Sequence, residues 1–162
     1  MDLFSAVRKG NKSLVESLLK LHADPNYVES KWTPIFHALY DNHDDIVRLL
    51  VKYGASVNVS DSTEDTPLYF ASWGGSADMV KLLLDHGADP NVGSKEGTAG
   101  HGEESNLDVA IDHIDDDYVN YYDNVGEEQG EEYGDLDTSK YHDFNADRFH
   151  AIKLLILYGA KK

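Results

Sequence analysis

The chain contains no cysteine among its 162 residues. Disulfide bonds, thiolate zinc sites and cysteine nucleophiles are therefore excluded. Long hydrophobic runs are missing too, because no segment approaches the roughly 20 apolar residues that a membrane span needs. The first residues, 1–11, lack the pattern of a signal peptide. We therefore expect no contact with a membrane and a cytoplasmic location.

Positive charge is scarce. The chain has 14 Lys and Arg against 30 Asp and Glu, a formal net charge of −16. The excess is local, since residues 112–147 hold 13 acidic side chains and a single Lys, which gives −12 of that total. Nucleic acid is excluded as a partner because phosphate is neutralised by a basic face. The charge favours a partner protein with a basic surface.

Catalytic motifs are also absent from the chain. It contains no GxSxG, phosphate-binding loop or HExxH sequence. The run Asp115–Asp117 does not begin a calcium loop, because the sixth residue from Asp115 is Asn120 where that loop needs Gly. His113 beside Asp112 could meet His142 across the insertion and hold zinc, which leaves a metal-dependent enzyme open as an alternative. We expect no catalytic residue, no metal and no cofactor.

The chain does contain an internal repeat. The block TPIFHAL from Thr33 returns as TPLYFAS from Thr66. The block YGASVN from Tyr53 returns as HGADPN from His86, at the same offset along the chain. Self-similarity at a fixed period of about 33 residues indicates a stack of small supersecondary units. Such stacks offer an extended binding surface and usually no catalytic pocket.

Each unit is predicted to be two short antiparallel helices. Thr33 and Thr66 are natural N-caps, and each is followed by Pro at the first helical position. Gly54, Gly87 and Gly159 follow the apolar stripe of the second helix, where a left-handed C-cap is needed. The units span about residues 1–28, 29–61, 62–94 and 95–162, and together form one domain.

These motifs resemble the ankyrin repeat, and the resemblance covers nearly the whole chain outside residues 113–145. It implies an all-α solenoid of stacked helix-turn-helix units with projecting β-turns or hairpins. It also implies a protein that binds other proteins and seldom catalyses a reaction. The His of the family's TPLH signature is replaced by Phe4, Phe36, Tyr69 and Asp108. We expect Phe36 and Tyr69 to compensate by packing.

An acidic, Tyr-rich insertion interrupts the last unit. The Leu-to-Val spacing of 12 residues in the third unit becomes a Leu-to-Ile spacing of 45 in the last, so about 33 residues have been added, at about 113–145. Apolar residues at spacings of three and four predict that the first helix of this unit continues to about Val125. Residues 127–140 are predicted to be a mobile loop, and the second helix to resume near Asn145 or Ala146.

The resemblance places a binding surface on the turn tips and on the first helices just past their buried Ala. Large aromatic side chains there are favoured as binding hot spots, and acid interleaved with Tyr in the insertion suits a basic partner. Trp32 and Tyr40 could equally cover the neighbouring unit, and the insertion could be a solvated loop. The residues expected to contact a partner are Trp32, Tyr40, Asp41, Trp73, Asp112, His113, Asp116, Asp117, Tyr118, Tyr121 and Tyr122.

The preferred function is a non-catalytic protein-binding module, monomeric alone, that docks a basic partner through its concave face and acidic insertion. By analogy with small ankyrin-like antidotes, the specific expectation is a stoichiometric inhibitor or immunity-type protein whose partner is a toxin or an enzyme. A generic scaffold or adaptor with a solubilising loop is the main alternative. A metal-dependent enzyme built on the insertion is a further one.

Overall fold

The computed structural model describes residues 2–93, 105–112 and 143–160. Helices account for all the regular structure in these ranges, and an isolated antiparallel bridge joins Glu29 and Trp32. No described helix is both long and apolar enough to cross a bilayer. The helices are α1 (Leu3–Arg8), α2 (Lys12–Lys20), α3 (Pro34–Tyr40), α4 (Asp44–Lys52), α5 (Pro67–Gly74), α6 (Ala77–Asp85), α7 (Asn106–Asp112) and α9 (Asp143–Leu157).

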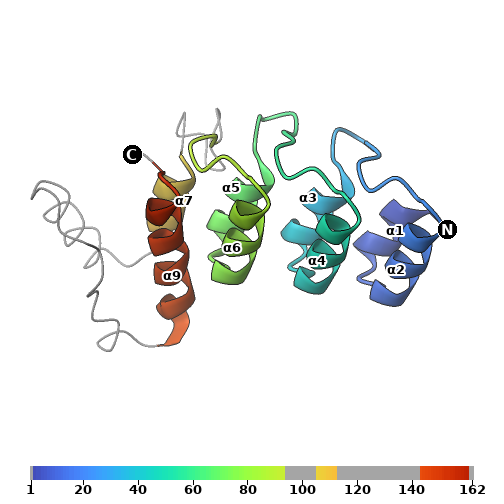
Figure 1. The fold of residues 1–162 in the computed structure, drawn as a ribbon, viewed down its shortest axis with the longest axis horizontal. Coiled ribbons are helices and arrows are strands. Elements are labelled where there is room, and N and C mark those ends of the chain that lie inside the picture. The colour runs from blue at the N-terminus through green and yellow to red at the C-terminus, as the bar shows by residue number, and fades with distance from the viewer. Residues whose placement is uncertain (1, 94–104, 113–142, 161–162) are drawn as a thin grey trace, which may run out of the picture.

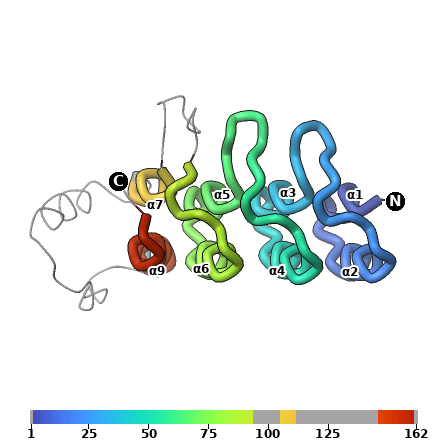
Figure 2. Tube along the Cα trace, turned by 45° about the horizontal axis from the view of Figure 1, so that its top comes forward, coloured from blue at the N-terminus to red at the C-terminus, as the bar shows by residue number. Residues whose placement is uncertain are grey.

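The helices form antiparallel pairs that stand side by side in one row, as predicted (Figure 1). One layer holds α1, α3, α5 and α7, and the other holds α2, α4, α6 and α9 (Figure 2). The turns before α3 and α5 project from the stack beside the first layer (Figure 2). We call the side of the first layer and its turns the inner face, and the side of the second layer the outer face.

The starts of α3 and α5 differ although their sequences match. The Thr66 hydroxyl accepts a hydrogen bond from the backbone N–H of Tyr69 at 3.1 Å, as an N-cap should. The prediction that the Thr33 side chain caps α3 is wrong, because the buried Thr33 hydroxyl has no hydrogen-bond partner among the described residues. The N–H of Phe36 instead donates to the Thr33 carbonyl at 3.1 Å. A tighter first turn therefore replaces the side-chain cap in α3.

Left-handed residues end the second helix of each pair, as predicted. Gly54, Gly87 and Gly159 have φ angles of 91°, 87° and 90°. The first pair uses His22 at the same place, with a φ of 63°. Only glycine adopts this region without a steric cost to Cβ, so His22 is a strained end of α2.

The core runs through the whole stack between the two layers. Phe36 and Tyr69 are both fully buried, which confirms that they pack where the family signature has His. Ile46, Val80 and Ile152 are fully buried on the second helices of successive pairs. Each pair contacts mainly its neighbours, so the stability of the stack comes from adjoining interfaces.

Asparagine side chains tie successive turns together. Asn26 donates to the Gly54 carbonyl at 3.0 Å and accepts from the N–H of Ser56 at 2.7 Å. Asn58 repeats this contact one unit later, donating to the Gly87 carbonyl at 2.8 Å and accepting from the N–H of Asp89 at 3.1 Å. Each Asn satisfies backbone groups of the next unit, so the repeated Asn fixes the spacing between units.

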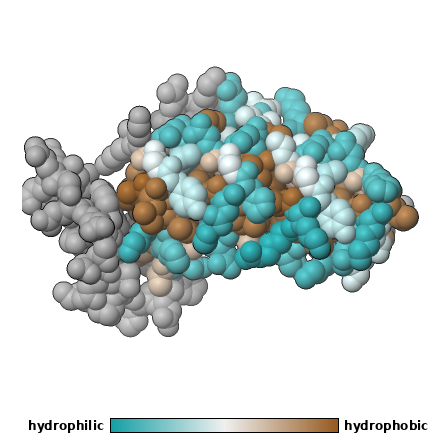
Figure 3. Space-filling view, in the orientation of Figure 1, coloured by the Kyte–Doolittle hydropathy of each residue, from teal (hydrophilic) through white to brown (hydrophobic). Residues whose placement is uncertain are grey.

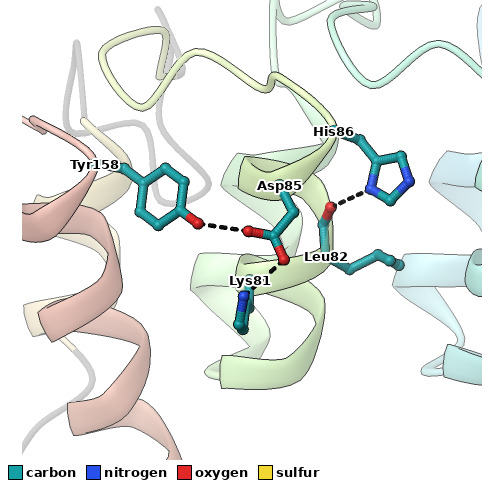
Figure 4. A network of polar contacts seen from close by, with 5 residues as sticks. All are labelled: Lys81, Leu82, Asp85, His86 and Tyr158. Atoms are coloured by element: carbon teal, nitrogen blue, oxygen red, sulfur yellow. Dashed lines mark hydrogen bonds and ion pairs between the residues drawn. The ribbon is translucent and has the colours of Figure 1, made fainter.

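A polar network joins the third and fourth pairs on the outer face (Figure 4). The Tyr158 hydroxyl donates to Asp85 at 2.5 Å, and Lys81 pairs with the same carboxylate at 2.6 Å. The hydrogen bond from Lys81 lowers the pKa of Asp85, and that from Tyr158 lowers it further. The hydrogen bond to Asp85 raises the pKa of the Tyr158 hydroxyl. Nearby, a ring nitrogen of His86 lies 2.8 Å from the Leu82 carbonyl.

A second contact between these pairs comes from Arg148 of α9. Its guanidinium donates to the Ser72 carbonyl at 3.3 Å and to the Trp73 carbonyl at 3.1 and 3.2 Å. A Cβ at Gly75 would lie 2.7 Å from this guanidinium, so the close approach requires glycine. A cation at these carbonyls also suits the negative end of α5. Burial lowers the pKa of Arg148.

The predictions for the acidic insertion fall mostly outside the described residues. The continuation of the first helix to Val125, the mobile loop at 127–140 and the bounds 113–145 all belong there. The structure describes α7 as far as Asp112. It starts α9 at Asp143, two or three residues before the predicted start of the second helix.

Candidate functional site

An aromatic cluster occupies the inner face between the second and third pairs. The Trp32 ring lies 4.7 Å from His37, 5.6 Å from Tyr40 and 5.8 Å from Phe70, centroid to centroid. The contacts with Tyr40 and Phe70 are edge-on, the arrangement that aromatic quadrupoles favour. Phe36, 6.1 Å from Trp32, forms the buried base of the cluster. Trp32 therefore contacts rings of two successive units.

Repeat geometry explains why these rings gather. His37 and Phe70 hold the same position in α3 and α5, one repeat period apart, and Tyr40 and Trp73 share the position one turn later. Because α3 and α5 pack side by side, equivalent positions face the same way. The Tyr40 side chain is 55% exposed and Trp73 is 37% exposed. Large aromatic area therefore stays open to solvent on the inner face.

Three charged side chains act on the ring of His37 in this cluster. Burial lowers the pKa of His37, and the positive charge of Arg8 lowers it further. The carboxylates of Asp41 and Glu29 act in the opposite direction. The aromatic cluster thus has acid on two elements, the turn before α3 and the end of α3, and a cation on α1.

Several carboxylates on the outer face have cationic partners, although Asp44 on α4 forms no ion pair among the described residues. Lys12 on α2 pairs with Asp45 on α4 at 3.3 Å, and Arg48 on α4 pairs with Asp78 on α6 at 2.9 Å. Lys20–Glu16 and Lys81–Asp85 are further pairs within single helices. Asp41 and Glu29 form no ion pair with any residue that the structure describes.

The surface seen from the outer side is mostly hydrophilic. Figure 3 shows this, with hydrophobic residues most extensive toward the end of the stack where α9 lies. Leu157 at the end of α9 is 69% exposed. It lies far along the stack from the aromatic cluster and carries no ring. The exposed residues there are thus separate from the aromatic cluster of the inner face.

The turn before α5 carries buried acid. The Asp61 carboxylate accepts hydrogen bonds from the N–H and hydroxyl of Thr63 at 2.9 and 2.8 Å, and from the N–H of Asp65 at 3.1 Å. Asp65 is buried, and one of its oxygens lies 2.8 Å from the same Thr63 hydroxyl, whose single proton the two carboxylates share. These contacts shape the turn. Asp65 holds the position that Trp32 occupies one unit earlier.

A cleft of about 260 Å³ lies between the turn before α5 and the turn after α6. Asp89 is its single ionisable lining residue, so this cleft holds no acid–base pair. No group of three His, Asp or Glu in residues 2–93, 105–112 and 143–160 is placed to hold a metal. The zinc hypothesis on His113 and His142 lies outside the described residues.

Comparison with known proteins identifies the repeat. The family model for ankyrin repeats in three copies matches residues 3–94. The chain belongs to the ankyrin-repeat family. It is 35% identical over 54 residues to the phosphate system positive regulatory protein PHO81 of Saccharomyces cerevisiae. It is 41% identical over 63 residues to the ankyrin repeat and KH domain-containing protein CBG24701 of Caenorhabditis briggsae.

Both ankyrin relatives are much longer than this chain. The matches cover 32% and 39% of this chain, but 5% of PHO81 and 2% of the KH-domain protein. The likeness therefore concerns the repeats. Ankyrin repeats are generally non-catalytic scaffolds that bind proteins, and this chain is a protein–protein interaction module.

The structure brings some of the predicted ankyrin binding residues together. Trp32, Tyr40 and Asp41 lie at one cluster, and Trp73 follows on the next helix of the same face. The contact of Trp32 with Phe70 is the covering role that the sequence left open, and the binding role stays a prediction. Asp112 ends α7. The other predicted residues lie outside the described ranges, namely His113, Asp116, Asp117, Tyr118, Tyr121 and Tyr122.

Sequence reasoning missed part of this surface. Phe70 and His37 were not predicted as members, although they share one repeat position. Aligning every inner-face position, and not only those just past the buried Ala, would have found His37 and Phe70. Glu29 lies on the turn tip at about 27–32, which the resemblance already placed on the binding surface.

Proposed function

We propose that the chain binds a basic partner protein through the aromatic part of its inner face and inhibits that partner as a stoichiometric, immunity-type protein. It acts as a cytoplasmic monomer that occupies one partner molecule. The acidic insertion at 113–145 supplies a second contact, which speeds encounter by long-range attraction. The partner is a toxin or an enzyme with a basic surface.

The observation that carries this proposal is the exposed aromatic surface at Tyr40 and Trp73, beside acid at Asp41 that forms no ion pair within the described part of the chain. Tyr and Trp supply large contact area while fixing few torsions, so they are enriched in binding hot spots. The net charge of −16 adds attraction for a basic protein. The specific role as an inhibitor rests on analogy and charge.

The test needs a purified partner. Proteins retained by the immobilised full chain are identified, and each candidate is purified and titrated by calorimetry. We expect one partner per chain. The Tyr40→Ala and Trp73→Ala double variant should weaken binding at least tenfold, about 1.4 kcal/mol or more. Tyr158→Ala, which removes an exposed aromatic of the outer face, should leave affinity unchanged. Equal loss in both variants would contradict the proposal.

The inhibitory role has its own readout. The partner's activity should fall in step with complex formation and vanish at one equivalent of the chain. A variant with the acids of residues 115–137 changed to Asn and Gln should associate more slowly, with a weaker salt dependence. A partner that keeps full activity in the complex is not inhibited.

Full activity of the partner in the complex would favour a second candidate function, that of a scaffold or adaptor. The observation for it is that the matched repeats occupy 5% and 2% of the long relatives. An adaptor would bind through the same aromatic residues, and its association rate would not depend on the acids of the insertion.

A further inference from the structure

We propose that the surface formed by Trp32, Tyr40 and Asp41 is a receptor for a guanidinium group, and that the partner presents it on an exposed arginine-rich segment. This inference rests on the proposed function and specifies which side chain of the basic partner is read. It concerns the described inner face alone.

The rings supply the first part of the receptor. The Trp32 and Tyr40 planes meet at 64° with centroids 5.6 Å apart, and Phe70 meets Trp32 at 75°. Trp32 is half-buried among these rings, and the exposed side of the cluster is that of Tyr40. The negative face of Trp attracts a cation more strongly than that of any other side chain. Tyr40 is 55% exposed, so this corner is open to a partner.

The acids supply the second part. Asp41 directly follows Tyr40, and both Asp41 and Glu29 act on the ring of His37, which contacts Trp32. Neither acid pairs with a cation in the described ranges, whereas the outer-face acids Asp45 and Asp78 both do. A partner cation would therefore give Asp41 and Glu29 the ion pairing that Asp45 and Asp78 already have on the outer face.

Arg8 limits where that cation can sit. It occupies on α1 the position that Tyr40 holds on α3, and its charge reaches His37. Like charge disfavours a cation on the α1 side, so the partner's side chain is directed toward Tyr40 and Asp41. Guanidinium fits better than ammonium because it is planar, stacks on aromatic rings and forms paired hydrogen bonds to a carboxylate.

Two tryptophans make the site directly observable, because the chain has Trp32 and Trp73 and no other. In the full-length Trp73→Phe variant, emission reports Trp32 alone. The probes are unstructured peptides of repeated Gly-Ser-Arg, with matched Gly-Ser-Lys and Gly-Ser-Glu peptides. The Arg peptide should change Trp32 emission saturably and bind on the order of fivefold more tightly than the Lys peptide. This ratio should persist at about 300 mM salt, where plain charge attraction is screened.

Variants separate the receptor from general acidity. In the Trp73→Phe background, Tyr40→Ala and Asp41→Asn should each weaken the Arg peptide several-fold. The matched change Asp45→Asn on the outer face should not, although it removes the same charge. Equal binding of Arg and Lys peptides, an unchanged Trp32 emission, or equal effects of Asp41→Asn and Asp45→Asn would overturn the inference.

The failures of the two proposals are distinguishable. An Arg peptide that binds without changing Trp32 emission has gone elsewhere on the chain, which refutes the receptor but leaves a basic partner possible. Tighter binding of the Glu peptide would refute the receptor and the basic partner together.

Discussion

Backbone strain at His22 shows how one residue departs from the repeat. The second helix ends in Gly54, Gly87 or Gly159 in three units, and in His22 with a φ of 63° in the first. A side chain with Cβ in this region costs about 1–2 kcal/mol. The first unit thus carries a penalty that the others avoid.

His22→Gly should therefore stabilise the protein. We expect the free energy of unfolding to rise by about 1 kcal/mol, measured by urea denaturation. Gly87→Ala is the matched control, and it should lower the free energy of unfolding. A Cβ at Gly87 meets nothing within 4 Å, so it adds backbone strain alone. Loss of stability in His22→Gly would show that the His22 side chain contributes more than its backbone strain costs.

His37 makes stability depend on pH. Its pKa in the folded chain lies below the ordinary value of 6.5, chiefly because of burial. The unfolded chain then binds more protons as the pH falls, so the stabilisation is complete above pH 6.5 and is lost below it. His37→Phe copies Phe70 of the next unit and removes this titration.

The melting temperature is the readout for His37. Between about pH 7.5 and pH 5.5 it should fall less in His37→Phe than in the parent chain, because the other titrating groups are common to both. A fall of equal size in the two proteins would mean that His37 is as easily protonated folded as unfolded.

At the scale of elements, one helix departs from the pattern of its equivalents. The helices α2, α4 and α6 each begin directly after Asn11, His43 or Ser76, whereas α9 begins earlier, at Asp143. Arg148 occupies the equivalent of His43 and Ser76 by repeat alignment, and there it lies inside the helix. The Arg148 side chain lies against Gly75 at the end of α5, just as the His43 side chain lies against Gly10 after the end of α1.

Removing this contact should loosen the joint between the last two pairs. Arg148→Ala leaves the Ser72 and Trp73 carbonyls without their charged donor, and we expect a loss of about 2 kcal/mol in unfolding free energy. Arg48→Ala is the control, since its ion pair with Asp78 is exposed and worth less than about 1 kcal/mol. Equal losses of unfolding free energy in the two variants would show that the Arg148 contact with α5 stabilises the protein no more than an exposed ion pair does.

The sequence predicted the elements that its period repeats. The helices, the left-handed glycines and the packing of Phe36 and Tyr69 follow from local chemistry that recurs from one unit to the next. Arg148 and the meeting of Glu29 with the aromatic cluster depend on where separate elements lie in space, and no spacing encodes that. The orphaned hydroxyl of Thr33 likewise reflects a first-turn geometry that its TP motif does not distinguish from that of Thr66.

For the whole molecule, the two faces of the stack have different chemistry. The outer face pairs Asp45 and Asp78 with Lys12 and Arg48 of the neighbouring units. The inner face presents exposed Tyr40 and Trp73, with Asp41 left without a cation among the described residues. The buried core between the two layers holds the stack together, whereas the inner face has exposed aromatic and acidic groups to offer to another protein.

Hydrogen exchange of the full chain with and without its purified partner tests this division most directly. The account predicts slowed exchange at residues 29–41 and 70–74, with α2 and α4 unchanged. Slowed exchange confined to the outer helices, or to the end of α9 around the exposed Leu157, would contradict it.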